Sequence, residues 1–282
     1  PTAAATVNSN VSCNGGSNGN ASVSVSAGNG PFTYQWTPSG GTGSSANNLS
    51  AGNYSVNVID ANGCITSVSL SLTQPAAISA QLSSTPTSCS NSSDGTATVT
   101  ASGGSGSFNY LWTPGGSTAS HPTGLSSGNY SVTITDGNGC TVSSQTTITS
   151  PSAVTATATP VAISCNGSAN GSVSVISNGG AGGFTYSWSP SGGNASTASG
   201  LASGTYTVTV TDLNGCTATA SATVTQPAAL QLTTSSIAAN CNSANGSASV
   251  TVSGGSGSYS YSWTPGGGTG SSISNINAGN YT

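Results

Sequence analysis

Charged side chains are nearly missing from this sequence. Its 282 residues include neither lysine nor arginine, only four acidic residues and one histidine, so that 1% are charged; roughly 25% is usual for a soluble domain. Because phosphates and anionic lipids are bound through cationic side chains, the sequence predicts no nucleic-acid partner and no electrostatic attraction to membranes. One histidine and scattered carboxylates also leave little for general acid–base catalysis, which indicates that the protein is not an enzyme.

Long apolar runs are missing as well. No segment reaches the roughly 18 consecutive apolar residues of a membrane helix, so we expect no membrane insertion in this segment. The start of the chain shows no charged region followed by an apolar run, and we therefore expect no signal peptide there. Because the chain begins at Pro1 and stops at Thr282 within a pattern that it has completed three times, we interpret it as a fragment of a longer exported chain.

The sequence consists of copies of a repeat of about 76 residues. Every copy has a first cysteine and a Tyr-x-Trp group, and the first three copies have a second cysteine 51 residues after the first. Strand-like runs end at Gln74-Pro75, Ser150-Pro151 and Gln226-Pro227, where proline cannot donate to a sheet ladder. These boundaries predict four domains joined by short linkers, namely repeat 1 (1–75), repeat 2 (76–151), repeat 3 (152–227) and a truncated repeat 4 (228–282).

Within a repeat the apolar residues recur with a period of two. Small apolar or aromatic residues alternate with hydroxyl residues in Ala21–Ser26, Tyr54–Val58 and Val68–Leu72, and again in Tyr206–Val210 and Ser247–Val252. This alternation is typical of half-buried antiparallel strands, and the Gly-rich and Asn-Gly clusters between the runs supply turns. Six or seven short strands around an aromatic centre predict an all-β chain of tandem immunoglobulin-like β-sandwich domains.

The aromatic residues are the candidate core. A tryptophan can bury on the order of 200 Å², which is a large contribution to the stability of a domain this small. The alternative is a sugar-stacking surface, but residues two apart on a strand share a face, and the Tyr-x-Trp pairs should therefore enter the core together. These pairs are Tyr34 and Trp36, Tyr110 and Trp112, Tyr186 and Trp188, and Tyr261 and Trp263.

An Asp-x-Asn-Gly-Cys motif precedes the second cysteine of each complete repeat. We interpret it as a hairpin turn, in which the aspartate caps the loop and Asn-Gly supplies the positions of positive φ. The alternative is a calcium loop, which the motif resembles at its start, but no further carboxylate lies nearby to complete it. The turn residues are Asp60, Asn62 and Gly63, Asp136, Asn138 and Gly139, and Asp212, Asn214 and Gly215.

Two other titratable residues stand outside this motif. Asp94 occupies a position where the other repeats have asparagine, and we interpret it as a turn residue. His121 precedes a proline in a Gly- and Ser-rich stretch and has no counterpart in the other repeats, so we interpret it as a solvated loop histidine. A metal site or a catalytic triad needs partners that the sequence does not place beside it. We therefore predict no catalytic residues, no metal site and no cofactor.

Seven cysteines in a chain so poor in reactive groups indicate disulfides and an oxidising compartment. Four strands are expected between the first and second cysteines of a repeat, and an even number returns the chain to the same end of the domain. A further strand within Thr37–Ser45 would reverse that conclusion. We favour pairing within repeats and consider pairing between neighbouring repeats as the alternative. The first scheme joins Cys13 to Cys64, Cys89 to Cys140 and Cys165 to Cys216, leaving Cys241 unpaired; the second joins Cys64 to Cys89, Cys140 to Cys165 and Cys216 to Cys241.

The repeat resembles the SprB repeat of large surface adhesins from gliding bacteria. The resemblance rests on Asn14–Val25, Tyr34-Gln-Trp36, Leu49–Val58 and Asp60-Ala-Asn-Gly-Cys64, and it recurs along nearly the whole chain. The last copy stops before its Asp-x-Asn-Gly-Cys motif. The resemblance implies export by the type IX secretion route, display on the outer cell surface, and a role in adhesion or gliding.

The sequence therefore favours an extracellular protein with a mechanical role. The first hypothesis is the repetitive stalk of a bacterial cell-surface adhesin that supports attachment or gliding. The alternative is a subunit of an extracellular filament or sheath, because uncharged strand edges invite lateral or donor-strand contacts. A third hypothesis is glycan or ice binding through threonine rows such as Thr205–Thr209. The expected partners are other copies of the repeat or chain and, in the third case, surface polysaccharide.

Overall fold

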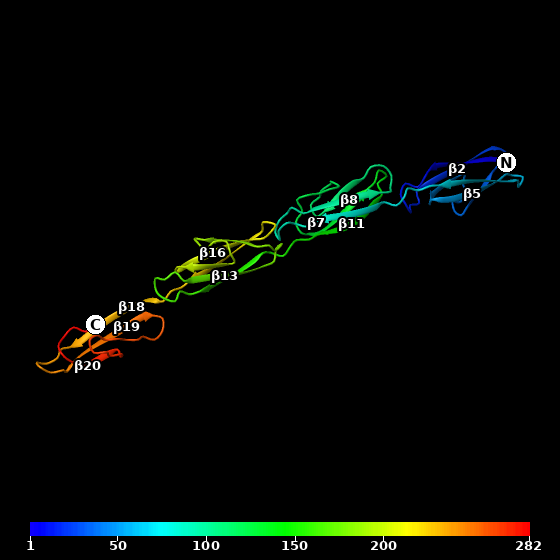
Figure 1. The fold of residues 1–282 in the computed structure, drawn as a ribbon. Helices are drawn as coiled ribbons and strands as arrows, with labels where there is room; N and C mark the ends of the chain where they lie inside the picture. Colours follow the sequence, from blue (N-terminus) through cyan, green and yellow to red (C-terminus); the bar gives the residue numbers. More distant parts are fainter. The chain divides into compact units, whose positions relative to one another are not determined.

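The computed structural model describes all residues from Pro1 to Thr282 as an all-β chain (Figure 1). It forms two compact units, Pro1–Ser150 and Pro151–Thr282. The first unit holds repeats 1 and 2, the second holds repeats 3 and 4, and each is described by itself. No helix of the chain is long and apolar enough to cross a membrane.

Repeat 1 is a sandwich of two three-stranded antiparallel sheets. One sheet has the order β1-β2-β4 and the other has the order β3-β5-β6. This arrangement confirms the prediction of an immunoglobulin-like β-sandwich, with sheets that alternate inward apolar and outward polar residues. The strands are β1 (Thr2–Ser9), β2 (Gly19–Ala27), β3 (Thr33–Thr37), β4 (Ser45–Leu49), β5 (Gly52–Ile59) and β6 (Ile65–Leu72).

The segment between β3 and β4 returns the chain along the domain without forming a strand. β2 is antiparallel to β4, β3 is antiparallel to β5, and a tight turn after Leu49 joins β4 to β5, so β3 and β4 point in the same direction. The residues from 38 to 44 must therefore run back across the sandwich. Trp36 holds them, because its Nε1 donates to the Gly43 carbonyl at 2.9 Å. This return places the first and second cysteines of a repeat at opposite ends of the domain.

Repeat 3 has the same six strands, and its sheets have the orders β12-β13-β15 and β14-β16-β17. Buried and outward-facing residues alternate along its strands as they do in repeat 1: Val208 and Val210 are fully buried, while the intervening threonines lie on the other face. The strands are β12 (Thr155–Val161), β13 (Gly171–Asn178), β14 (Thr185–Ser189), β15 (Thr197–Leu201), β16 (Gly204–Thr211) and β17 (Thr217–Val224).

Repeat 2 lacks the strand that corresponds to β4. Pro122 stands where repeat 1 has Ala46, and proline has no N–H to donate to the ladder. An isolated bridge between Gly95 and Leu125 replaces the strand, and the Pro122 carbonyl still accepts a hydrogen bond from Ala97 N at 3.1 Å. The remaining strands are β7 (Ser79–Thr85), β8 (Thr96–Ser102), β9 (Asn109–Thr113), β10 (Gly128–Thr135) and β11 (Thr141–Ile148), which pair as β7-β8 and β9-β10-β11.

Repeat 4 consists of a single three-stranded sheet. Its strands β18 (Ala228–Ile237), β19 (Gly246–Gly255) and β20 (Ser272–Ile276) pair in the order β18-β19-β20 and correspond to β1, β2 and β4 of repeat 1. The residues 279–282 correspond to the first four residues of β5 in repeat 1, and Thr282 N donates to the Thr264 carbonyl at 2.9 Å, as expected for the start of that strand.

Each of the first three repeats has its own hydrophobic core. The four tryptophans are between 1% and 8% exposed, and each indole N–H donates to a backbone carbonyl seven residues further along the chain at 2.9 Å. The tyrosines of the Tyr-x-Trp pairs, Tyr34, Tyr110, Tyr186 and Tyr261, are half-buried. The Tyr-x-Trp pairs of repeats 1–3 therefore pack in the hydrophobic cores.

Candidate functional site

The junction between repeats 1 and 2 is closed by a disulfide. Cys13, the first cysteine of repeat 1, is bonded to Cys140, the second cysteine of repeat 2, across 127 residues. The expected pairing within repeats is therefore wrong, because neither Cys13 with Cys64 nor Cys89 with Cys140 is formed. The alternative pairing between Cys64 and Cys89 is not formed either, since Cys64 is an exposed free thiol.

The remaining cysteines also depart from the expected pairing within repeats. Cys165 is an exposed free thiol, so it is not bonded to Cys216. Cys89 and Cys216 are each held in a disulfide. Cys241, expected to be unpaired, is an exposed free thiol.

The return segment explains why the pairing within a repeat fails. Cys13 lies in the loop between β1 and β2, at the end of repeat 1 where β6 leaves: the neighbouring Val11 N donates to the Thr73 carbonyl at 3.0 Å. Cys64 lies in the turn between β5 and β6 at the opposite end. The first cysteine of repeat 1 therefore faces the second cysteine of repeat 2, and the Cα atoms of Cys13 and Cys140 are 5.7 Å apart.

The Asp-x-Asn-Gly-Cys motif forms the hairpin turn that carries the second cysteine. In repeat 2, Asp136 Oδ1 accepts hydrogen bonds from Asn138 N at 3.0 Å and Cys140 N at 2.9 Å. Its other oxygen, Oδ2, accepts from Ser105 N in the neighbouring loop at 2.9 Å. Asp60 and Asp212 cap their turns in the same way and are buried, as Asp136 is. The carboxylate therefore sets the position of the turn cysteine.

On the side of repeat 1, the linker residues Gln74 and Pro75 hold the loop that carries Cys13. Asn14 Nδ2 donates to the Pro75 carbonyl at 3.0 Å, and Gly15 N donates to Gln74 Oε1 at 2.8 Å. Across the junction, Asn138 Nδ2 of repeat 2 donates to the Ser12 carbonyl of repeat 1 at 2.9 Å. These contacts fix both cysteine loops without any charged pair between the repeats.

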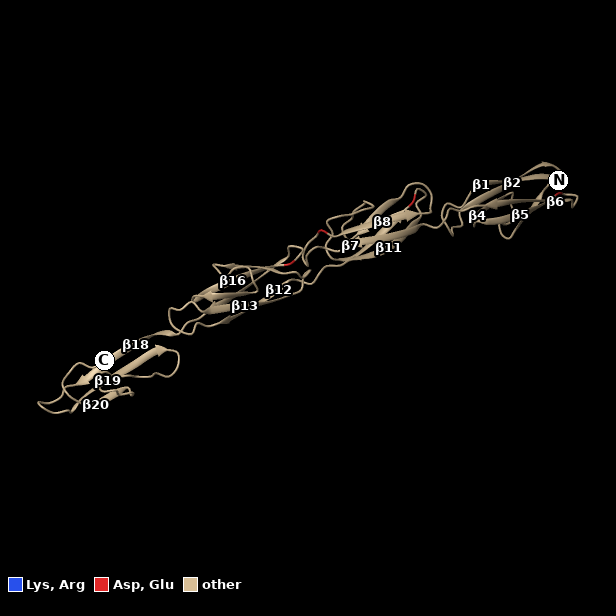
Figure 2. Cartoon of the chain, viewed as in Figure 1, with Lys and Arg blue, Asp and Glu red and all other residues tan.

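The few carboxylates are all in loops, and no basic residue accompanies them (Figure 2). The backbone N–H groups of Cys64 and Ala181 hold the pKa values of Asp60 and Asp212, respectively, below the usual 3.8. Burial alone would raise the pKa of Asp136, but the N–H groups of Cys140, Ser105 and Asn138 outweigh it and lower the pKa. Hydrogen bonds from Ser88 and Ser92 lower the pKa of Asp94 to about 2.

These shifts predict that the fold loses stability only in acid. A carboxyl with a lowered pKa in the folded state stabilises that state fully above about pH 4, and this stabilisation disappears as the pH falls through the folded pKa. We expect a constant unfolding midpoint from pH 7 to about pH 5 and a steep fall between about pH 4 and pH 2. Thermal unfolding followed by circular dichroism at each pH measures it.

Asp94→Asn is the matched control for this acid dependence. Asp94 Oδ1 accepts from Ser88 N at 3.0 Å, and Asn18 Oδ1 accepts from Ser12 N at 3.0 Å in the same loop of repeat 1. The asparagine variant should therefore keep the neutral-pH midpoint and show a smaller loss in acid. A midpoint that falls already between pH 7 and pH 5 would contradict this account.

The structure shows the surroundings of His121 and of the other possible metal ligands. His121 is exposed, and its Nδ1 lies in hydrogen-bonding contact with Thr98 Oγ1 on β8. No group of three or more His, Cys, Asp or Glu side chains is arranged to hold a metal ion. The junction between repeats 1 and 2 is held by the disulfide of Cys13 and Cys140 and by hydrogen bonds.

The fold and the junction define a class of protein: tandem immunoglobulin-like β-sandwiches, with a disulfide between two consecutive domains, repeats 1 and 2. The family model of the SprB repeat matches residues 5–41, 82–117, 155–193 and 238–268, together just over half of the chain. The chain belongs to the SprB-repeat family. SprB repeats are structural repeats of surface adhesins, and disulfides fit an extracellular location.

Similar solved structures are other tandem immunoglobulin domains. The Sidekick-1 immunoglobulin domains 1–5 are 13% identical, with a TM-score of 0.33 over 96% of this chain and 66% of that one. A Dscam structure is 15% identical, with a TM-score of 0.26 over 79% of this chain and 72% of that one. The chain thus spans about two thirds of the Sidekick-1 structure. A search of curated proteins found no match.

Proposed function

We propose that the chain is part of the stalk of an extracellular bacterial adhesin, which supports surface attachment or gliding and is exported by the type IX route. The observation that carries this proposal is the disulfide between Cys13 of repeat 1 and Cys140 of repeat 2. A cross-link between consecutive domains bypasses both of their cores, so tension is carried by a covalent bond. Such a bond is not needed for catalysis or ligand recognition, whereas it strengthens a spacer that bears a mechanical load.

The composition supports the same role. Without lysine, the side chains cannot form the isopeptide bonds that could otherwise reinforce a stalk domain, so disulfides are the available covalent reinforcement. Without lysine and arginine, the chain also has no site for trypsin-like proteases. The proposed partners are neighbouring copies of the repeat, and the adhesive contact itself belongs to another part of the adhesin.

A competition and replacement experiment tests this function. In cells that display the parent adhesin, we expect attachment to survive when repeats 1–4 are exchanged for an unrelated immunoglobulin tandem of equal length, and to fall when the segment is deleted. The soluble 282-residue chain should not inhibit attachment. Inhibition by the soluble chain, or binding of the chain to a glycan array, would instead identify the repeats as the adhesive surface and contradict the stalk role.

A further inference from the structure

Tension along the chain enters repeat 1 through β1. This strand begins beside the turn between β5 and β6, where the Pro1 carbonyl accepts a hydrogen bond from Thr66 Oγ1. It ends near the junction with repeat 2, where Val11 N donates to the Thr73 carbonyl at 3.0 Å. Because the eight residues of β1 are already extended, tension can straighten only the five other residues from Pro1 to Cys13, which adds less than about 2 nm.

The disulfide carries this tension out of repeat 1. Cys13 is bonded to Cys140 of repeat 2, so the covalent route from β1 into repeat 2 is a single disulfide. The backbone route between the same two domains is far longer, because it passes through β2 to β6 and the linker, residues 14–75. Tension follows the shortest covalent route, and residues 14–75 therefore stay slack while the bond is intact.

The hydrophobic core of repeat 1 lies on this slack route. All nine buried residues of the core lie between Ala21 and Leu72. β1 contributes none of them: its Ala3, Ala5 and Val7 are half-buried and pack against the core from one side. The strand that carries the load and the core are therefore different parts of the repeat, and the cross-linked repeat does not need a stable core to resist tension.

The other contacts at this junction are weak beside a covalent bond. Asn138 Nδ2 of repeat 2 donates to the Ser12 carbonyl at 2.9 Å, and no pair of opposite side-chain charges joins the two repeats. The hydrophobic cores of the two repeats are also separate clusters. Neutral hydrogen bonds position the two loops but contribute little against tension. The disulfide therefore decides whether tension reaches residues 14–75.

A hollow beside the disulfide gives small molecules access to it. The hollow has a volume of about 400 Å³, and its lining includes Cys13, Cys140, Pro75 and Ile78. Both cysteines are half-buried, so neither sulfur is sealed inside a core. Cleavage of a disulfide requires a thiolate to reach one of its sulfurs. A small thiol can enter this hollow and attack the bond while both repeats remain folded.

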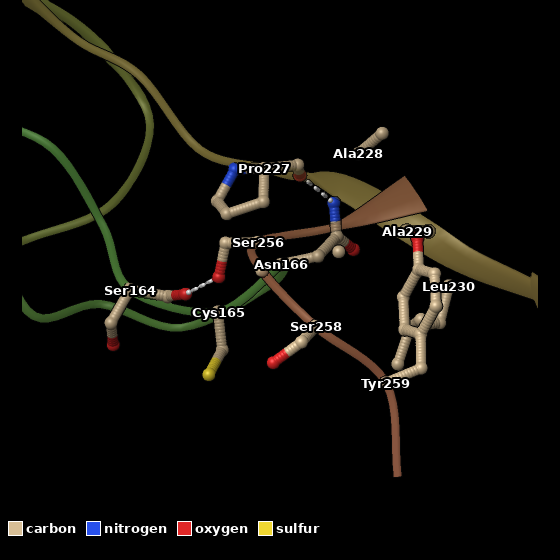
Figure 3. Close-up of a pocket in the computed structure, with 12 residues that line it drawn as sticks. Ser164, Cys165, Asn166, Pro227, Ala228, Ala229, Leu230, Ser256, Ser258 and Tyr259 are labelled. Carbon is tan, nitrogen blue, oxygen red and sulfur yellow. Dashed lines mark hydrogen bonds between the residues drawn. The ribbon is translucent and has the colours of Figure 1, made fainter. Parts of the chain in front are cut away.

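Repeat 3 shows the same loop with a free thiol. Figure 3 shows the exposed Cys165 side chain beside the hydrogen bond between Asn166 and Pro227. Asn166 Nδ2 donates to the Pro227 carbonyl at 3.0 Å, as Asn14 Nδ2 does to the Pro75 carbonyl in repeat 1. The linker contact is therefore made without a disulfide at this cysteine. We expect the Cys13 loop to keep its form after reduction, so that the bond can form again.

We propose that the disulfide between Cys13 and Cys140 is a thiol-sensitive switch that sets whether repeat 1 can lengthen under tension. With the bond intact, β1 and the disulfide carry the load, and repeat 1 stays folded. After reduction the load passes through residues 14–75, so repeat 1 unfolds and lengthens. This proposal rests on the load-bearing role proposed above and adds a means of regulating it at the same junction.

The switch needs a reductant, and a small dithiol such as dithiothreitol supplies it. One thiolate of the reagent attacks a cysteine sulfur, which breaks the protein disulfide, releases the other cysteine as a thiolate and leaves a mixed disulfide. The second thiolate of the reagent then attacks its own sulfur in the mixed disulfide and releases the first cysteine. One protein disulfide is reduced to two thiols, one dithiol is oxidised to a cyclic disulfide, and its two protons pass to the cysteines.

Force spectroscopy on single full-length chains tests the switch. The native oxidised chain is compared with a Cys13→Ser/Cys140→Ser chain, which lacks this disulfide and leaves the other cysteines unchanged. Both are held between their termini at constant force. The chain without the disulfide should show an unfolding step of about 20 nm, the extended length of residues 14–75. The native chain should show this step only after dithiothreitol is added.

Val56→Ala assigns this step to repeat 1. Val56 is fully buried on β5, so its truncation should shorten the lifetime of the folded repeat at constant force by about tenfold or more in the chain without the disulfide. In the native oxidised chain the same substitution should change no step. Ser55→Ala, on the outward face of β5, is the matched control and should change the lifetime in neither chain. Circular dichroism checks that each variant is folded before it is stretched.

Two results would overturn the proposal. One is a step in the native oxidised chain that responds to Val56→Ala, because repeat 1 would then be loaded in spite of the bond. The other is the absence of such a step from the chain without the disulfide. These measurements need no cell surface, so the switch and the role of the stalk in attachment can fail separately.

Discussion

Reduction of the disulfides should lengthen the stretched chain by at least about 44 nm. The bond between Cys13 and Cys140 spans 127 residues, and each extended residue adds roughly 3.3–3.6 Å. In the oxidised chain this length is withheld from an applied force even after the β-sandwich cores have opened. Single-molecule force spectroscopy from terminus to terminus, with and without reductant, measures the contour length directly.

An alkylated but unreduced sample is the control, because it separates the loss of free thiols from the loss of disulfides. Its contour length should equal that of the untreated oxidised chain. An unchanged length after reduction would show that no bond withholds chain from the applied force. Peptide mapping without reductant provides a second check, since it should recover Cys13 linked to Cys140. Recovery of Cys13 linked to Cys64 would restore the pairing within repeats and remove the covalent basis of the stalk.

Trp112→Ala should unfold repeat 2 or nearly so. Trp112 is 1% exposed, and its indole N–H donates to the Ala119 carbonyl at 2.9 Å, so the change removes core packing and a hydrogen bond. Truncation of a buried tryptophan costs about 3–5 kcal/mol, a large part of the roughly 5–15 kcal/mol that stabilises a domain. Hydrogen exchange followed by mass spectrometry should show the loss of protection in peptides of repeat 2, with peptides of repeat 1 as an internal reference.

The neighbouring Leu111→Ala is the matched control for this prediction. Leu111 lies on the same strand, β9, but points outward and is 52% exposed. Its truncation should change the free energy of unfolding by no more than about 0.5 kcal/mol. If both variants destabilised repeat 2 equally, or neither did, Trp112 would not be the core residue that its burial indicates.

The strands and turns of this protein could be predicted because they depend on local patterns. The alternation of Tyr54–Val58 marks β5, since only a period of two places Tyr54, Val56 and Val58 on one face. The turn role of Asp60 was predictable for a similar reason, because its carboxylate bonds to backbone N–H groups only two and four residues away. Pro122 also indicates the strand missing from repeat 2, because proline has no N–H to donate to the ladder.

The cysteine pairing could not be predicted in the same way. It depends on the return of the chain between Thr37 and Ser45, which carries no alternation and forms no ladder of its own, although Trp36 holds it in place. Counting strands in the sequence therefore placed Cys13 and Cys64 at the same end of the repeat, whereas they lie at opposite ends.

The sequence alone determined the repeat length, the all-β fold class, the aromatic core positions and the lack of any charged chemistry. These features follow from composition and from the spacing of residues along one strand or turn. Only the tertiary structure decided which cysteines meet. The cysteine pairing depends on the return of the chain between β3 and β4 and on the linker contacts of Asn14 and Gly15, and such contacts between residues far apart in the chain leave no periodic pattern in the sequence.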